Sequence, residues 1–275
     1  MEAESRGWLR EPYRLFHSTD RRNMDFEAHF HEFHKIVFCL KGSVTYAVEG
    51  TVFRLERGDL LVIPAHCIHR SSFGADNPYE RVILWIAADY PAKFGEPMLE
   101  KIFRETRFFR ADGFSWSMLE ERLRDAERAL KATTPGHKLL AETYLVQFLL
   151  AMGELAGGAV WDGQPGVRSD RSLNELLTYI GGHLSENMTA QSLAERFGLE
   201  EKSLGRRFRA YVGCPLHQYI VQKRMIGAAE EIRGGAPVLK AAKHAGYKDY
   251  SAFLKAFRKA YGCAPGELKS RENVR

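Results

Sequence analysis

The chain of 275 residues has few cysteines and no long apolar run, and each absence excludes a class of protein. Its four cysteines are scattered without a Cys-x-x-Cys pair, which argues against a disulfide framework or a zinc ribbon. The longest apolar runs, such as residues 60–65, are far too short to span a bilayer. The N-terminal sequence MEAESRGWLREPYR has no apolar segment of the kind found in secretion signals, so we expect none. These features favour a cytoplasmic globular protein.

Positive charge is concentrated in the C-terminal part of the chain. The whole chain carries a net charge of +5, but residues 170–275 contain 18 Lys and Arg against 11 Asp and Glu, a net charge of +7. The preceding residues carry a net charge of −2. This asymmetry predicts that only the C-terminal part meets phosphate. Solvated helices also carry excess lysine and arginine, so charge alone does not establish DNA binding.

A short pattern occurs twice in the last hundred residues, as LAERFGLEEKSLGRRFRAYVGCPL (193–216) and AAKHAGYKDYSAFLKAFRKAYGCAPGEL (241–268). Each copy has a small residue in a short helix, then a turn glycine, then a basic helix with two apolar anchors four residues apart. The anchors are Leu204 and Phe208 in the first copy and Phe253 and Phe257 in the second. This order is typical of a helix-turn-helix unit, in which one helix supports a second helix in the major groove. We therefore predict two recognition helices, over about 201–212 and 250–261.

The exposed faces of both predicted recognition helices carry side chains that can donate to phosphates and base edges. The expected DNA-contacting residues are Lys202, Ser203, Arg206, Arg207, Arg209, Tyr250, Ser251, Lys255, Arg258 and Lys259. The first unit has a weaker helix, because Glu200 is a poor N-cap and Gly205 lowers helix propensity, whereas Asp249 is a good N-cap for the second helix. We expect the first unit to read less sequence or to depend on phosphate contacts. A helix over about 215–232 joins the units, and a spacing of roughly 34 Å would place both in successive major-groove segments.

The N-terminal half changes from a strand pattern to a helix pattern. Short β-rich runs separated by glycine turns cover 35–40, 43–48, 51–55, 59–63 and 81–87, which predicts an antiparallel sandwich or barrel. Apolar stripes then predict two helices. The stripe residues are Leu119, Leu123, Ala126 and Leu130 in the first helix, and Leu140, Tyr144, Phe148, Met152 and Leu155 in the second. This helical pair either covers one face of the barrel or forms a dimer interface.

Three histidines in the strand region form a candidate site. His29 and His31 lie two residues apart, so they share a face in an extended strand, and His69 from a neighbouring strand would complete a three-nitrogen metal site. The arrangement resembles the motifs of the cupin barrel, with Gly58, Pro64 and His69 matching the second motif. The usual glutamate ligand is absent, because its place falls at Lys35 or Ile36. The alternatives are a bound divalent metal and a metal-free ligand pocket in the barrel mouth. Candidate wall residues are Phe38, Tyr46, Phe53 and Trp85.

The segment from about residue 173 to 269 resembles the paired helix-turn-helix domain of the AraC/XylS transcription regulators. The matching features are LAERFGL, Tyr219 with KRMIGAA, AGYKDYSAFLKAFRKAYG and the final CAP. The resemblance implies that the start and middle of each recognition helix read bases, which here means Lys202, Ser203, Arg206, Tyr250, Ser251 and Lys255. It also implies a cupin-like arm that senses a small molecule, often a carbohydrate. The expected partners are double-stranded DNA, this effector, a second copy of the chain and RNA polymerase.

These observations predict an α+β protein of two domains. Residues 1–112 would form a cupin-like effector-sensing antiparallel β-barrel, 113–156 a helical pair, 157–170 a linker, and 171–275 an all-α double helix-turn-helix domain. The leading hypothesis is a ligand-responsive, sequence-specific transcription regulator rather than an enzyme. One alternative is a metal-dependent cupin enzyme with an appended helical domain, which stoichiometric metal at the three histidines would favour. Another is a constitutive DNA-bending protein, which salt-sensitive binding with little sequence preference would favour.

Overall fold

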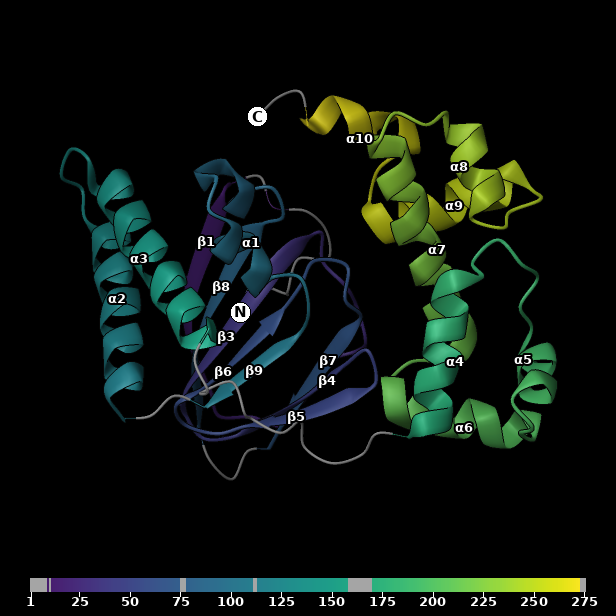
Figure 1. The fold of residues 1–275 in the computed structure, drawn as a ribbon, viewed down its shortest axis with the longest axis horizontal. Coiled ribbons are helices and arrows are strands. Elements are labelled where there is room, and N and C mark those ends of the chain that lie inside the picture. The colour runs from purple at the N-terminus through teal and green to yellow at the C-terminus, as the bar shows by residue number, and fades with distance from the viewer. Residues whose placement is uncertain (1–8, 10, 75–77, 111–112, 158–169, 273–275) are drawn as a thin grey trace.

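The computed structural model describes residues 9, 11–74, 78–110, 113–157 and 170–272. A β-rich domain with two long helices on its outer side occupies one half of the molecule, and a helical domain occupies the other (Figure 1). Most of the predicted linker lies outside the described residues. None of the helices within the described part of the chain combines the length and apolar character needed to cross a membrane.

The strands form two antiparallel sheets. The five-stranded sheet has the order β1 (Tyr13–Asp20), β8 (Tyr79–Ala87), β3 (Phe33–Lys41), β6 (Asp59–Ile63) and β9 (Arg107–Arg110). The four-stranded sheet has the order β2 (Met24–Asp25), β7 (His69–Phe73), β4 (Val44–Val48) and β5 (Thr51–Leu55). Every strand predicted from the sequence is present, with bounds within two residues. The two sheets do not close into a barrel, so the predicted closed barrel is wrong and the predicted antiparallel arrangement is right. The alternation of residues along a strand shows which side chains share a face, but it does not show which strands pair, so it could not predict whether the sheets close.

Strand alternation separates two cores on either side of β3. Val37 and Cys39 face the space between the sheets, whereas Ile36 and Phe38 pack toward the helices. Phe38 therefore does not line the space between the sheets, contrary to its suggested role as a pocket wall. Its ring instead lies 5.9 Å from the ring of Trp116. The other suggested wall residues, Tyr46, Phe53 and Trp85, are buried in clusters that do not include the helices.

Two long helices cover the five-stranded sheet, as Figure 1 shows. They are α2 (Gly113–Lys131) and α3 (His137–Gly157), and their buried side chains share one core with β3, β6 and β8. The pair thus covers one face of the β-rich domain, which is one of the two alternatives given for it. The expected stripes were partly wrong: Leu130 is 36% and Leu140 is 48% exposed, while Ala129, Leu145 and Leu149 are buried. Helix α3 is apolar over much of its circumference, so composition does not fix which side faces the sheet.

Two short elements precede these helices, the 3-10 turn η1 (Pro91–Phe94) and helix α1 (Pro97–Ile102).

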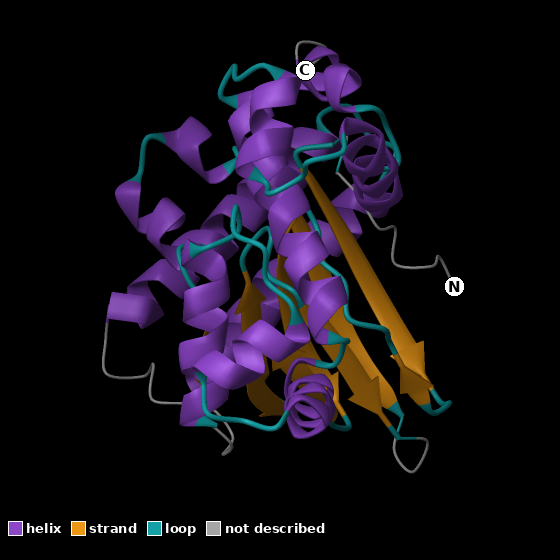
Figure 2. Ribbon diagram, turned by 90° about the vertical axis from the view of Figure 1, so that its right-hand side faces the viewer, coloured by secondary structure: helices purple, strands orange, loops and turns teal. Residues whose placement is uncertain are grey.

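The C-terminal domain is entirely helical within its described residues, and its helices lie in front of the strands in Figure 2. Its elements are α4 (Arg171–Gly182), α5 (Ala190–Arg196), α6 (Glu201–Val212), α7 (Leu216–Arg233), α8 (Val238–His244), α9 (Tyr250–Tyr261) and α10 (Pro265–Glu272). Helices α6 and α9 have the bounds predicted for the recognition helices. The four predicted anchors are completely buried. Their burial on one face of each helix leaves the basic face available to solvent.

Candidate DNA-binding surface and histidine site

The two recognition helices begin differently, as their sequences predicted. Asp249 caps α9, because its Oδ1 accepts a hydrogen bond from the backbone N–H of Ser251 at 2.8 Å. Glu200 makes no side-chain cap to α6. Both helices end in the same way, at a left-handed glycine whose N–H donates to an arginine carbonyl: Gly213 to Arg209 and Gly262 to Arg258. The repeated sequence therefore gives identical C-termini but unequal N-termini.

Most of the expected DNA-contacting side chains are exposed. The exposed residues are Lys202, Arg206, Arg209, Tyr250, Ser251, Lys255, Arg258 and Lys259. Ser203 and Arg207 are half-buried. The structure thus presents two basic helix faces to solvent, one in each unit. Figure 1 places the two helices, α6 and α9, near opposite ends of α7.

Arg207 has a partner within the protein. Its guanidinium donates to Oδ2 of Asp170 at 2.6 Å, and Asp170 also accepts the backbone N–H of Leu173 as the N-cap of α4. Burial alone would raise the pKa of Asp170, but the hydrogen bonds from Arg207 and from the backbone outweigh it, so this pKa is lowered. Arg207 therefore holds α6 against the start of α4, and contact with DNA stays a prediction for this residue.

Helix α7 joins the two units and is itself fixed to the first. Arg224 donates to the carbonyl of Leu184 at 2.9 Å and to that of Glu186 at 2.6 Å, which secures the connection between α4 and α5. Gly246, the turn glycine of the second unit, sits against the same arginine with φ of +77°. A β-carbon there would lie 2.9 Å from the Leu184 carbonyl oxygen, so this position requires glycine. One helix of 18 residues, roughly 27 Å long, thus separates the two units.

The three predicted histidines come together in the β-rich domain. His29 and His69 face each other in an antiparallel bridge, with backbone hydrogen bonds of 3.0 and 2.8 Å. The ring centroids of His29 and His69 are 4.6 Å apart. The ring centroid of His31 lies 4.8 Å from that of His29 and 5.2 Å from that of His69. All three are at least 93% buried, and one ring nitrogen from each lies within 4.8 Å of the others. The three histidines that the sequence groups together therefore lie side by side, and their role as a ligand or metal site stays a prediction.

The hydrogen bonds of two rings show which nitrogen is protonated and which is available as a ligand. Nδ1 of His29 lies 2.7 Å from the carbonyl oxygen of Glu27, and Nδ1 of His69 lies 3.0 Å from that of Cys67. A carbonyl only accepts, so Nδ1 carries the proton in both neutral rings and Nε2 carries a lone pair. A backbone carbonyl that orients an imidazole in this way is typical of metal-binding histidines.

His34 lies outside this cluster, although it is close in sequence. Its ring stacks on Phe103 at 4.3 Å, and its Nδ1 accepts the N–H of Ala65 at 3.0 Å. Burial lowers the pKa of His34 to about 4, with a backbone carbonyl opposing the shift and His66 adding to it. His34 is therefore neutral and has a structural role. Lys35, which stands near the usual place of the cupin glutamate, is buried with Nζ 5.5 Å from the centre of the Tyr46 ring.

The sequence did not reveal that the β-rich domain packs directly on the helical domain. Glu49 occupies the two-residue turn between β4 and β5 with φ of +46°, a left-handed conformation that is uncommon outside glycine. Its carboxylate accepts hydrogen bonds from Tyr219 and Lys223 of α7, both at 2.6 Å, and from the N–H of Ile68 at 2.8 Å. Burial and the Glu49 carboxylate both raise the pKa of Tyr219. Gly50 completes the turn.

Further contacts lie along α7 and at the ends of both recognition helices. Contacts from the β-rich domain to the helical domain include those of Glu32 with Arg233, of His66 with Glu230 at 3.3 Å, and of Phe30 with Tyr261, whose ring centroids are 5.9 Å apart. At α6, a β-carbon on Gly50 would lie 2.4 Å from Cε1 of Tyr211. The available signal was a tyrosine in the last turn of each recognition helix. Tyrosine is suited to a surface that is partly apolar and partly polar.

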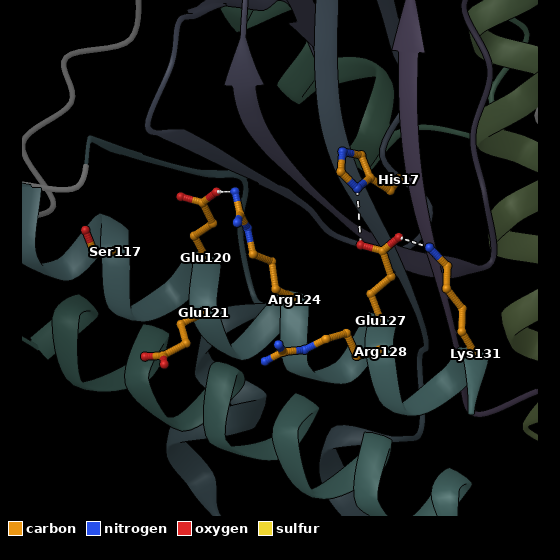
Figure 3. Close-up of a pocket in the computed structure, with 8 residues that line it drawn as sticks. All are labelled: His17, Ser117, Glu120, Glu121, Arg124, Glu127, Arg128 and Lys131. Carbon is orange, nitrogen blue, oxygen red and sulfur yellow. Dashed lines mark hydrogen bonds and ion pairs between the residues drawn. The ribbon is translucent and has the colours of Figure 1, made fainter. Parts of the chain in front are cut away.

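A surface groove of about 610 Å³ lies between β1 and the exposed face of α2 (Figure 3). Its lining is almost entirely charged: His17, Ser117, Glu120, Glu121, Arg124, Glu127, Arg128 and Lys131. His17 bridges Glu80 at 2.9 Å and Glu127 at 3.1 Å, and Glu127 also pairs with Lys131. Small-molecule sites are concave and mostly apolar, so this open, charge-paired groove is better described as a solvated helix face. It contains none of the predicted site residues.

Two family models match the chain. The AraC-like ligand binding domain matches residues 11–149, and a helix-turn-helix domain matches residues 193–271. The transcriptional activator RhaS of Enterobacter sp. (strain 638) is 22% identical over 249 residues, which covers 89% of this chain and 87% of RhaS. RhaS of Salmonella heidelberg (strain SL476) is 23% identical over 252 residues with the same coverage.

Among solved structures, ToxT from Vibrio cholerae strain SCE256 aligns over 95% of this chain and 98% of its own, with 12% identity and a TM-score of 0.42. The C-terminal domain of AraT from Geobacillus stearothermophilus aligns over 40% of this chain at 26% identity and a TM-score of 0.37. The first family model alone spans more than half of the residues, and the second covers most of the helical domain. The chain belongs to the AraC family of transcription regulators, with a ligand-binding domain followed by a helix-turn-helix DNA-binding domain.

Proposed function

We propose that α6 and α9 enter successive major-groove segments of one DNA site, where the protein regulates transcription. The observation that carries this proposal is the pair of exposed basic helix faces, held apart by the single helix α7. Lys202, Ser203, Arg206 and Arg209 act from α6, with Arg207 beside them. Tyr250, Ser251, Lys255, Arg258 and Lys259 act from α9. Exposed cations supply phosphate contacts, and the residues at the start and middle of each helix read base edges.

The two units divide this work unequally. Helix α9 has a capped N-terminus, so its first residues Tyr250 and Ser251 are held in place for base contacts. Helix α6 lacks a side-chain cap and contains Gly205, whose position offers open space instead of a side chain. The proposed role of α6 is therefore mainly to hold phosphates, and that of α9 is mainly to read sequence.

The β-rich domain makes the regulation conditional on a small effector, for which a carbohydrate is the class suggested by the family resemblance. An effector that binds this domain alters the contacts made by Glu32, Glu49 and His66 with α7, and so changes how the two readers are held. RhaS is named a transcriptional activator, and we propose activation through contact with RNA polymerase for this chain also. We expect the protein to act in the cytoplasm without enzymatic activity.

A second copy of the chain would bind through the exposed ends of α2 and α3. Leu139 is 69% exposed, Leu140 is 48% exposed and Phe114 is 81% exposed, although each is a large apolar side chain. Burying such residues against a copy of the same surface would stabilise a homodimer. A dimer would place two pairs of recognition helices on one operator.

Selection from random DNA tests the function. Purified full-length protein is used to enrich fragments over several rounds, and the Kd of the enriched site is compared with that of shuffled DNA at one fixed salt concentration. We expect a preference of at least a thousandfold, in the range typical of specific regulators. A ratio near one would contradict sequence-specific regulation and favour a DNA-bending protein.

Sedimentation of wild type beside Leu139→Glu tests the dimer, which the variant should dissociate.

A further inference from the structure

The histidine cluster has the ligand set and the orientation of a transition-metal centre. Three imidazoles from two chain segments converge, and the rings of His29 and His69 direct Nε2 away from the carbonyls that hold Nδ1. Imidazole nitrogen suits zinc, copper, nickel and iron rather than magnesium or calcium. Three histidines leave at least one position of a tetrahedral ion open for water or for an effector oxygen.

We propose that His29, His31 and His69 bind one divalent transition-metal ion, and that this ion strengthens DNA binding by tightening the contact of the β-rich domain with α7 and α9. The proposal specifies the ligand of the sensing domain, and its DNA readout rests on the regulator function proposed above. Zinc is the probe of choice, because it has no redox chemistry that would complicate the test.

Metal binding would draw two chain segments together. The ligand nitrogens lie within 4.8 Å of one another, whereas zinc–nitrogen bonds of about 2.1 Å in a tetrahedral site place nitrogens roughly 3.4 Å apart. The segment that carries His29 and His31 would therefore close on the segment that ends at His69. These two segments already share backbone hydrogen bonds between His29 and His69 and from the N–H of His66 to the carbonyl of His31.

Residues inside the first segment touch the DNA-binding domain. Phe30 lies between the two ligand histidines, and its ring packs on Tyr261 in the last turn of α9. Glu32 follows His31 directly and forms an ion pair with Arg233 in the last turn of α7. Burial raises the pKa of Tyr261, with Glu32 adding to the shift and Arg233 opposing it, so these three side chains share one environment. A metal ion that held His29 and His31 in place would therefore also hold the contacts of Phe30 and Glu32 with the DNA-binding domain.

Residues of the second segment touch the same helix. His66 has a left-handed backbone with φ of +67°, and its ring lies 3.3 Å from Glu230 of α7. Ile68 is fully buried in the core of the helical domain, and its N–H is bound by Glu49, which holds Tyr219 and Lys223. The ion would therefore link two segments that contact α7 along its length. A stiffer contact reduces the conformational freedom that DNA binding must remove, so affinity rises.

Zinc titration of the full-length protein tests the site. After a chelator has removed bound metal and the protein has been dialysed, we expect wild type to take up one zinc per chain, and we expect Co²⁺ to give the visible absorption of a four-coordinate site with three nitrogen ligands. His31→Gln and His29→Gln should each weaken zinc binding at least tenfold. Two control variants should bind zinc like wild type: His34→Gln, a buried histidine of the same segment outside the cluster, and His217→Ala, an exposed one. Absence of a bound ion, or equal affinity in all five proteins, would overturn the site, and the Co²⁺ spectrum of wild type decides the matter if a ligand variant does not fold.

DNA affinity with and without zinc tests the coupling. We expect zinc to lower the Kd of wild type for its selected DNA site at least fivefold, within the usual range for coupled sites. Arg233→Gln removes the ion pair with Glu32 but no metal ligand, so it should retain zinc and lose this effect. Glu231→Gln is the matched control, because Glu231 lies two residues before Arg233 on α7 and pairs with His244 inside the helical domain. Stoichiometric zinc with an unchanged Kd would overturn the coupling. Loss of sequence preference in both states would instead contradict the regulator function and leave the zinc titration intact.

Discussion

The two helix-turn-helix units share a sequence pattern but are held by different means. Each buries two anchors four residues apart and ends at a left-handed glycine. The second unit has a capped recognition helix, whereas the first depends on a neighbour, because Arg207 of α6 pairs with Asp170 at the start of α4. The repeat therefore preserves the buried frame of the unit. The N-terminus of α9 is stabilised by its own cap, whereas α6 has no side-chain cap and is fixed to α4 through Arg207 in the middle of the helix.

The units also meet the sensing domain differently. Tyr211 of the first unit packs closely on the β4–β5 turn, where Gly50 leaves no room for a side chain. Tyr261 of the second unit packs on Phe30, inside the histidine segment. Arg70, the residue after His69, also contacts the first unit, because its guanidinium donates to the carbonyl of Ala210 in α6 at 3.4 Å. Residues adjacent to the histidine cluster therefore touch both units, and we expect both units to respond to the state of the sensing domain.

Removing the anchors is the most severe test of whether the two frames are equivalent. Phe208→Ala and Phe257→Ala should each lower the free energy of unfolding by about 3–5 kcal/mol, because both rings are completely buried and truncation leaves a cavity. Urea denaturation followed by circular dichroism measures this loss. Leu239→Ala is the control, since that side chain is 53% exposed and lies outside the proposed dimer surface, so the change in stability should be less than about 0.5 kcal/mol. Anchors that differed by more than about 2 kcal/mol would show that the frames are not equivalent.

Substitutions on the exposed faces test whether α6 mainly contacts phosphates and α9 mainly contacts bases. Arg206→Ala should weaken binding to all sequences alike and reduce the salt dependence, because the role proposed for α6 is mainly to contact phosphate. Lys255→Ala should cost about 1–3 kcal/mol on the preferred site and relax the preference at one base pair. Binding to a panel of single-base variants at several salt concentrations separates these results. If Arg206→Ala changed the preferred sequence and Lys255→Ala did not, the roles would be reversed.

The sequence predicted the helical domain more completely than the β-rich domain. The two recognition helices were placed at their observed bounds, because turn glycines, anchors and basic residues repeat at fixed spacing. Strands β1 and β7 were missed, since their polar residues, as in HRSSF, weaken the β signal. The phase of α3 was misjudged because apolar residues occur on most of its sides. Periodicity is informative only where one face of an element is polar.

The candidate sites show the same contrast. His29, His31 and His69 could be grouped because extended segments put alternate residues on one face, and the structure brings them together. The contacts of Glu49 with Tyr219 and Lys223 could not be predicted, since the partners are 170 and 174 residues apart. A polar residue at a turn looks like an ordinary surface residue until its neighbours in space are known. The positive φ of Glu49 is a structural signal that sequence does not carry.

Removing the cap of α9 and adding one to α6 tests whether the helix N-termini account for the difference in stability between the two units. Asp249→Ala should cost about 1 kcal/mol, because it removes the hydrogen bond to the N–H of Ser251. Glu200→Ser should stabilise α6 by up to about 1 kcal/mol, since it supplies a cap that is missing. Chemical denaturation of both variants and the double variant measures the changes. Equal and small effects at the two positions would remove capping as the cause of the asymmetry.

Gly205→Ala sharpens the same comparison within the body of α6. A β-carbon at Gly205 meets nothing within 4 Å, so the alanine should stabilise the protein by about 0.5–1 kcal/mol through helix propensity alone. The control is Gly246→Ala, which should destabilise, because its left-handed backbone and the Leu184 carbonyl both oppose a side chain. Thermal unfolding of the two variants shows whether each one raises or lowers the stability. A loss of stability in Gly205→Ala would mean that the glycine has a structural role in the first unit.

The ion pair between Asp170 and Arg207 provides the smallest effect and the only one that depends on pH. Asp170→Asn should lower the stability at pH 7 by about 0.5 kcal/mol, because the pair is partly exposed and screened by water. The pKa of Asp170 is lower in the folded chain than its ordinary value of 3.8. The contribution is therefore complete above that value and is lost as the pH falls through the lower pKa of the folded state. Urea denaturation of wild type and variant at several pH values from 7 down to about 3 should show their difference narrowing at the acid end. Glu175→Gln, which breaks the exposed pair with Arg171, is the control and should shift the stability by less than about 0.5 kcal/mol. A difference that stayed constant with pH would show that the charge of Asp170 does not stabilise the fold, and that the first unit lacks the support of this ion pair.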